Sequence, residues 1–238
     1  MPTAFFVDAG FYLKRFPRVY RTKDETDPVI VARTLHEMCF GHLTQRGGVE
    51  QKDLYRIFVY DCVPLTKKAE LPISRQSIDF SQTTTAKFRL DFHEELRRLR
   101  KVALRLGRLQ DGRAWKLRPA VMKALLKRER QFVGLTDADF VYDVQQKGTD
   151  MRIGVDIASV AHKRQADQMI LVAGDADFVP AAKLARREGI DFILDPMWNP
   201  ISNDLHEHID GLRSTCPRPV SSVLPAPISI AATVRDLT

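Results

Sequence analysis

One stretch late in the chain constrains the fold more than any other part. Gln168–Ala173 is apolar after its first residue, Asp177–Glu188 follows with helical spacing and ends at Gly189, and Ile190–Leu194 is apolar again. Parallel strands need a connection of helix length between them, so strand, helix and strand in this order favour a parallel pairing. The pattern predicts an α/β fold with helices on both faces of a mostly parallel sheet.

The rest of the chain continues this alternation. Strands are predicted at Ala4–Val7, at Leu54–Tyr60, closed by Asp61 and Pro64, and at Val102–Leu106, stopped by Gly107. Helices are predicted from Pro28 to about Gly47 after the cap Asp27, at Asp91–Arg100, at Pro119–Arg130, from Asp150 to about Lys163, and from the cap Ser202 to about Asp210. Residues 65–90 are polar and predict a loop. A Pro-rich arm or tail is expected over residues 214–238.

Composition limits the class of protein. The three cysteines, Cys39, Cys62 and Cys216, are far apart and lack metal-ligand spacing, which is typical of reduced thiols in a cytosolic protein. The apolar N-terminal run is cut by Asp8 and has no basic region before it, so it predicts a strand and not a signal peptide. No apolar run approaches the roughly 20 residues that cross a bilayer. The expected location is the cytoplasm.

Charge is distributed unevenly. Residues 97–130 hold thirteen lysines and arginines against two acids, a net charge of +11, so the rest of the chain carries −4 of the +7 total. A basic block beside an acidic remainder fits a phosphate-attracting surface next to a metal-binding pocket, and a solvated helix face explains the block equally well. If the block is a phosphate-attracting surface that binds RNA, the residues expected to contact the RNA are Arg105, Arg108, Lys116, Lys123, Lys127 and Arg130.

Aspartates follow the predicted strands. Asp8 ends the first strand, and Asp175 and Asp177 come directly after Gln168–Ala173 and Gly174. Ligands of open α/β sheets bind outside the carboxyl ends of the strands, so these carboxylates are expected to converge. Hard oxygen ligands of this kind suit Mg²⁺ or Mn²⁺. For Asp177 alone, a helix cap is the simpler interpretation.

A fourth aspartate opens a predicted helix in the motif QKGTDMRIGVDI. Asp150 is favoured as a metal ligand, while Asp156, about 120° round the helix, is assigned an outer supporting or structural role. Lys147 either neutralises a phosphate oxygen or pairs with an acid. Other chemistries fit poorly, because Gly10 occupies the second position of a DxD phosphatase motif and no phosphate-binding glycine loop or G-x-S-x-G elbow is present.

The motifs FVDAGF, YRIFVYD, QKGTDMRIGVDI and LVAGDADFVPAAKLARREG resemble the NYN-domain family (LabA-like), a branch of the PIN-like nucleases, over roughly residues 3–212. The resemblance implies a PIN-like three-layer sandwich over residues 1–213. It also implies a Mg²⁺- or Mn²⁺-dependent ribonuclease site with catalytic acids at Asp8, Asp150, Asp175 and Asp177. Many members carry an asparagine shortly after the first aspartate, where this chain has Gly10, Phe11 and Tyr12.

Two functions follow from these observations. The first is a metal-dependent endoribonuclease that cuts single-stranded or structured RNA and leaves a 5′-phosphate. The alternative is a non-catalytic RNA- or nucleotide-binding module that keeps the acidic pocket. Assembly into a homo-oligomer is left open by the sequence.

Overall fold

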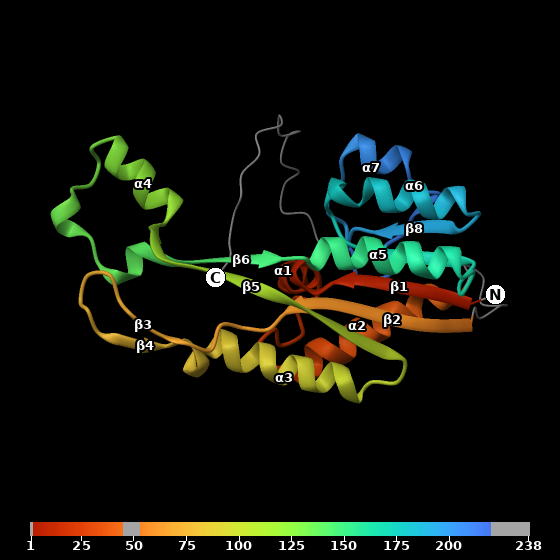
Figure 1. The fold of residues 1–238 in the computed structure, drawn as a ribbon, viewed down its shortest axis with the longest axis horizontal. Helices are drawn as coiled ribbons and strands as arrows, with labels where there is room; N and C mark the ends of the chain where they lie inside the picture. The colour runs from red at the N-terminus through yellow and green to blue at the C-terminus, as the bar shows by residue number, and fades with distance from the viewer. Residues whose placement is uncertain (1, 45–52, 220–238) are drawn as a thin grey trace.

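A seven-stranded sheet in the order β6-β5-β2-β1-β7-β8-β9 forms the centre of the computed structural model, which describes residues 2–44 and 53–219 (Figure 1). The strands are β1 (Pro2–Asp8), β2 (Asp53–Cys62), β5 (Val102–Leu117), β6 (Phe140–Lys147), β7 (Gln168–Val172), β8 (Asp191–Asp195) and β9 (Gly211–Leu212). All neighbouring pairs are parallel except β5 with β6. The first strand, β1, lies in the middle, between β2 and β7, so the strand order reverses there. Ligands of open α/β sheets bind at such a reversal.

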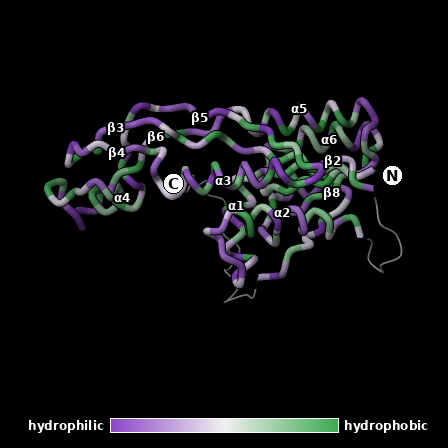
Figure 2. Tube along the Cα trace, turned by 90° about the horizontal axis from the view of Figure 1, so that it is seen from below, coloured by the Kyte–Doolittle hydropathy of each residue, from purple (hydrophilic) through white to green (hydrophobic). Residues whose placement is uncertain are grey.

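Two helical layers cover the sheet, as the sequence predicts. One layer holds α1 (Ala9–Val19), α2 (Pro28–Leu43) and α3 (Thr84–Arg98), and the other holds α5 (Thr149–His162), α6 (Val179–Arg187) and α7 (Asn203–Glu207). Within β1, Phe5 and Val7 face the first layer, whereas Ala4 and Phe6 face the second. This alternation buries both faces of the strand. In Figure 2 the hydrophobic colour concentrates where the strands lie between the helices.

An arm projects from the sheet, at the left of Figure 1. We define it as residues 108–147 together with the two-stranded sheet of β3 (Lys68–Glu70) and β4 (Ser77–Asp79). It carries α4 (Pro119–Leu126) and the 3₁₀ turns η2 (Phe132–Gly134) and η3 (Asp137–Asp139), and η1 (Phe80–Gln82) follows β4. The indole N–H of Trp115 donates to the carbonyl of Glu70 at 2.8 Å, which ties β5 to β3.

The predicted end of a strand at Gly107 is wrong. Strand β5 runs through Gly107 to Leu117 and pairs first with β2 and then with β6. A Cβ added to Gly107 would lie 3.0 Å from Cys62 Sγ and 3.1 Å from Thr149 Oγ1. Glycine is therefore needed here for close packing and not for a turn.

The predicted basic helix Pro119–Arg130 is too long. Helix α4 ends at Leu126, and Arg128 takes a left-handed conformation with φ of 60°. No residue of α4 is fully buried, and Met122 is exposed. The three cations Lys123, Lys127 and Arg130 therefore do not form one helical stripe.

Residues 65–90 contain more structure than the predicted loop, since β3, β4, η1 and the start of α3 lie there. Helix α3 begins at Thr84, seven residues before the predicted Asp91. Helix α1 and strands β6 and β9 had no counterpart in the prediction. The strands around β1 and the helices α2, α5, α6 and α7 agree with it, with shifts of a few residues at their ends. The expected helix end at Gly47 and Gly48 lies outside the described residues.

The start of the predicted tail packs on the domain. Ser214 Oγ donates to Asp195 at 2.8 Å, Thr215 Oγ1 donates to the carbonyl of Met38 at 2.9 Å, and Cys216 is buried. Most of the Pro-rich segment, residues 220–238, lies outside the described residues. All three cysteines are buried free thiols. Within residues 2–44 and 53–219, no helix is both long and apolar enough to cross a membrane.

Candidate active site

Asp8 lies at the carboxyl end of β1, at the reversal of strand order. It is half-buried and caps α1, since its Oδ1 accepts the N–H of Phe11 at 3.2 Å. Burial raises the pKa of Asp8 to about 6, with a further contribution from the negative charge of Asp150. The N–H bond opposes this rise but does not cancel it. Asp8 is thus a carboxylate fixed in orientation and costly to ionise.

Asp150 lies in the first turn of α5. Gly148 precedes the helix with φ of 79°, a conformation that favours glycine and turns the chain sharply from β6 into α5. The Asp150 side chain is exposed. The pKa of Asp150 is raised, chiefly by partial loss of hydration and to a smaller extent by the negative charges of Asp175 and Asp177.

Asp175 and Asp177 follow β7. Asp175, and not Asp177, is the capping residue, since its Oδ1 accepts the N–H of Asp177 at 3.1 Å. Both side chains are exposed. The phenyl ring of Phe11 lies directly against Gly174, on the Asp8 side of this loop.

The four carboxylates interact in a chain. Asp8 is linked electrostatically to Asp150, and Asp150 to Asp175 and Asp177. An all-oxygen donor set with unfavourable mutual repulsion fits a hard divalent cation. Among the described residues, however, no three His, Cys, Asp or Glu side chains lie close enough to hold one ion together. The arrangement therefore fits an ion bound by one or two carboxylates, with water and phosphate oxygens as further ligands, as is usual for Mg²⁺.

A cleft of about 1200 Å³ opens beside these acids. Asp8 and Asp175 lie at its acidic end. Two helices, α1 and α3, supply cations to its lining, and the arm closes one side with a mixed surface. The cationic lining residues are Lys14, Arg15, Arg18 and Arg89, and the arm contributes Leu109, Val141, Tyr142, Val144 and Gln146. The amide of Gln146 approaches Asp8 from β6, since both would contact a Cβ added to Gly10.

Sequence reasoning missed Asp61, the aspartate at the end of β2. It is buried, and its carboxylate accepts from Arg89 Nη1 at 2.5 Å and contacts His93 Nε2 at 2.8 Å. Burial alone would raise the pKa of Asp61, but His93 and Arg89 together lower it. The signal was present in the sequence, because Asp61 ends an apolar strand just as Asp8 does.

Of the two residues predicted to support the site, Asp156 is engaged by other side chains. Asp156 accepts the hydroxyl of Tyr60 at 2.8 Å and pairs with Arg105 at 3.4 Å, so it has a structural role against the sheet. The guanidinium of Arg105 also lies 5.5 Å from the ring centre of Phe58. Lys147 ends β6 with its side chain exposed.

The other predicted RNA contacts belong to the arm. Arg130 forms a two-pronged pair with Asp139, at 2.6 and 2.5 Å, and this pair closes the turn after α4. Lys116 pairs with Asp143 at 2.8 Å, and Lys127 lies 3.6 Å from Glu129. The remaining two, Arg108 and Lys123, are exposed. Arg105 and Arg130 thus act within the fold, which weakens their predicted roles in RNA binding.

A mostly parallel sheet between two helical layers, with aspartates at the ends of its central strands, is the architecture of a PIN-like nuclease domain. The family model of the NYN domain matches residues 87–207, just over half of the chain, and the chain belongs to this family. The matched range includes Asp150, Asp175 and Asp177, whereas Asp8 precedes it. A search of curated proteins found no match.

Proposed function

We propose that the chain is a metal-dependent endoribonuclease with its active centre between Asp8, Asp150, Asp175 and Asp177. One observation carries this proposal. The charge of Asp150 adds to the cost of ionising Asp8, which lies where the strand order reverses, and the charges of Asp175 and Asp177 add to the cost of ionising Asp150. The neighbouring Asp61, in contrast, is neutralised by Arg89 and His93. An uncompensated acidic pair beside a cation-lined cleft is suited to a divalent ion and a phosphodiester.

Bound Mg²⁺ or Mn²⁺ would supply a lowered pKa for water and stabilise negative charge on phosphate oxygens. The Phe11 N–H keeps the Asp8 carboxylate in one orientation. The attacking water oxygen bonds to phosphorus, the bond from phosphorus to the 3′ oxygen breaks, and the proton lost by the water ends on that 3′ oxygen. The products are a 5′-phosphate and a 3′-hydroxyl. In this proposal the RNA backbone lies along the cleft, against the acidic edge.

The test compares two aspartates on the same helix. Asp150→Asn should abolish cleavage of a labelled RNA in Mg²⁺ or Mn²⁺, as should EDTA with the parent protein. Asp156→Asn is the matched control, since Asp156 is engaged by Tyr60 and Arg105. It should cleave at close to the parent rate. Equal loss in both variants, or cleavage that survives EDTA, contradicts the proposal.

A non-catalytic RNA- or nucleotide-binding module is the second candidate. It is favoured by the spacing of the acids, because no three carboxylates of the described residues gather around one point. This candidate predicts RNA binding that persists in EDTA and in Asp150→Asn, with no cleavage by the parent protein in either metal.

A further inference from the structure

A second charged cluster lies at the same edge of the sheet as Asp8. It consists of Asp61 at the end of β2 and of Arg89 and His93, which are four residues apart on α3 and therefore share one face of that helix. Asp61 Oδ1 accepts from Arg89 Nη1 and from the backbone N–H of Cys62, and Oδ2 contacts His93 Nε2. Both carboxylate oxygens are therefore engaged.

This bonding sets Asp61 apart from the four candidate metal ligands and indicates a different role. The Asp61 side chain is fully buried, while the Arg89 side chain is 22% exposed. A buried carboxylate thus anchors a guanidinium whose outer part reaches solvent. The anchored cation has fewer conformations to lose on binding than a surface lysine has.

Arg89 lines the cleft that Asp8 and Asp175 also line. A guanidinium carries five N–H donors in a planar fork, and Asp61 takes one on Nη1. This fork matches two oxygens of a phosphate group. We propose that Arg89, held by Asp61, binds a backbone phosphate of the RNA strand beside the acidic edge.

The proposal rests on the proposed ribonuclease function and adds the path of the substrate. It places the strand along the cleft, between α1 and α3, where Arg18 also lines the wall. The exposed lysine of α4, Lys123, belongs to the arm, outside the residues that line this cleft. The ring of Phe80, which packs against Tyr142 at 4.9 Å between centres, lines the cleft as well.

The test uses full-length protein and a short fluorescein-labelled oligouridylate. Binding is measured by fluorescence anisotropy in EDTA, and cleavage is measured in Mn²⁺. Arg89→Gln should weaken binding roughly 10- to 100-fold, the loss expected for one hydrogen-bonded charge. It should also reduce the salt dependence of log Kd by about 0.7, the value for one phosphate contact on a single strand. Lys87→Gln on the same helix is the control and should leave both unchanged, since Lys87 is exposed and does not line the cleft.

Two further variants separate binding from folding. Arg89→Gln leaves a buried Asp61 with one partner fewer, so the double variant Asp61→Asn/Arg89→Gln restores neutrality and should bind as weakly as Arg89→Gln. Arg89→Lys keeps the charge without the fork and should recover part of the binding. Asp61→Asn alone should release Arg89 and raise KM more than it lowers kcat.

These measurements separate a failure of the Arg89 phosphate contact from a failure of the ribonuclease proposal. Suppose that the parent binds the oligonucleotide without cleaving it, and that Arg89→Gln binds more weakly and with a smaller salt dependence of log Kd. The phosphate contact is then supported and the catalytic proposal is contradicted. If folded Arg89→Gln or the folded double variant binds and cleaves like Lys87→Gln, Arg89 has only a structural role and the inference is overturned.

Discussion

The ring of Phe11 lies against the backbone of Gly174: a Cβ on Gly174 would lie 2.6 Å from Phe11 Cε2. The contact joins the first turn of α1 to the loop after β7, and these two segments carry Asp8 and Asp175. The distance between the two acidic segments is therefore set in part by the absence of a side chain at position 174.

Gly174→Ala should force the Phe11 ring out of place and destabilise the protein by about 1–3 kcal/mol, the usual cost of overpacking. Urea unfolding measures this change. Gly154→Ala is the control, because a Cβ there meets nothing within 4 Å and helix α5 should gain up to about 1 kcal/mol. Phe11→Ala added to Gly174→Ala should remove most of the clash, so additive losses in the double variant would contradict the contact.

Stability without metal should fall as pH rises from about 4 to about 6. The pKa of Asp8 is about 6 in the folded protein against an ordinary value of 3.8. The folded state keeps a proton that the unfolded state releases, so the contribution is fully present below pH 4 and is lost above pH 6. Asp8→Asn can still cap α1 and should be more stable than the parent at pH 7 by about 1–3 kcal/mol. Equal pH dependence of parent and variant in EDTA would refute the assignment.

Divalent metal should raise the melting temperature, because an ion that binds only the folded state stabilises it by mass action. The shift should be larger at pH 7 than at pH 5, since protons compete for Asp8. Asp175→Asn should reduce the shift, whereas Asp156→Asn should keep it. Melting curves that are the same with and without millimolar Mn²⁺ count against the site.

Charge reversal on the arm tests a second RNA surface. Lys123→Glu with Lys127→Glu should weaken RNA binding similarly for all sequences and lower the log–log salt slope by about 0.7 for each lost phosphate contact. Metal binding and melting temperature should change little, because both side chains are exposed. If the double variant binds like the parent at low and high salt, the RNA path is confined to the cleft.

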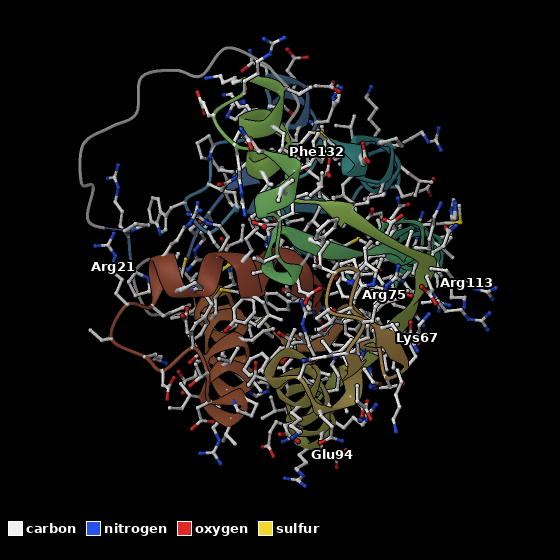
Figure 3. All side chains as sticks on the ribbon, turned by 90° about the vertical axis from the view of Figure 1, so that its left-hand side faces the viewer. Arg21, Lys67, Arg75, Glu94, Arg113 and Phe132 are labelled. Carbon is white, nitrogen blue, oxygen red and sulfur yellow. The ribbon has the colours of Figure 1, made fainter. Side chains whose placement is uncertain are left out.

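Exposed side chains elsewhere on the arm provide a control for this double variant. Figure 3 shows Phe132 on the arm and Lys67, Arg75 and Arg113 projecting on the right-hand side of that view. Leu126, Phe132 and Val133 are 78%, 71% and 97% exposed. Reversing the charges of Arg113 and Arg75 is the control. If this control weakens RNA binding as much as the change in Lys123 and Lys127, the effect comes from arm charge in general and not from α4.

Local sequence signals predicted the central fold well. Apolar runs that end in aspartate, helical spacing and Gly189 identified β1, β7, α6 and β8, because these elements are buried and their periodicity is unambiguous. Helix α1 escaped notice because Gly10 and Pro17 interrupt it, although Tyr12 and Phe16 lie on its buried face. The cytosolic location, inferred from the cysteines, stays a prediction.

Long-range contacts account for what sequence reasoning missed. Gly107 has the residue type of a turn, but its neighbours across the sheet demand a glycine within a strand. The end of α4 depends on Arg130 reaching Asp139 nine residues later, which no periodicity reveals. Arg89 lies in a segment predicted to be a loop, so its approach to Asp61 became visible only with α3 in place.

Strand β5 belongs to two structures at once, since its first half is part of the central sheet and its second half is part of the arm. From Gly107 to Leu117 it spans roughly 30 Å at the usual rise of a strand. The register of β5 against β6 shifts between Asp111 and Trp115, and Arg113 takes φ of 53° there, so the strand has one irregular point between the acidic edge and the far end of the arm. The length of β5 therefore sets an upper limit, and not a fixed value, for the span between the acidic edge and the far end of the arm.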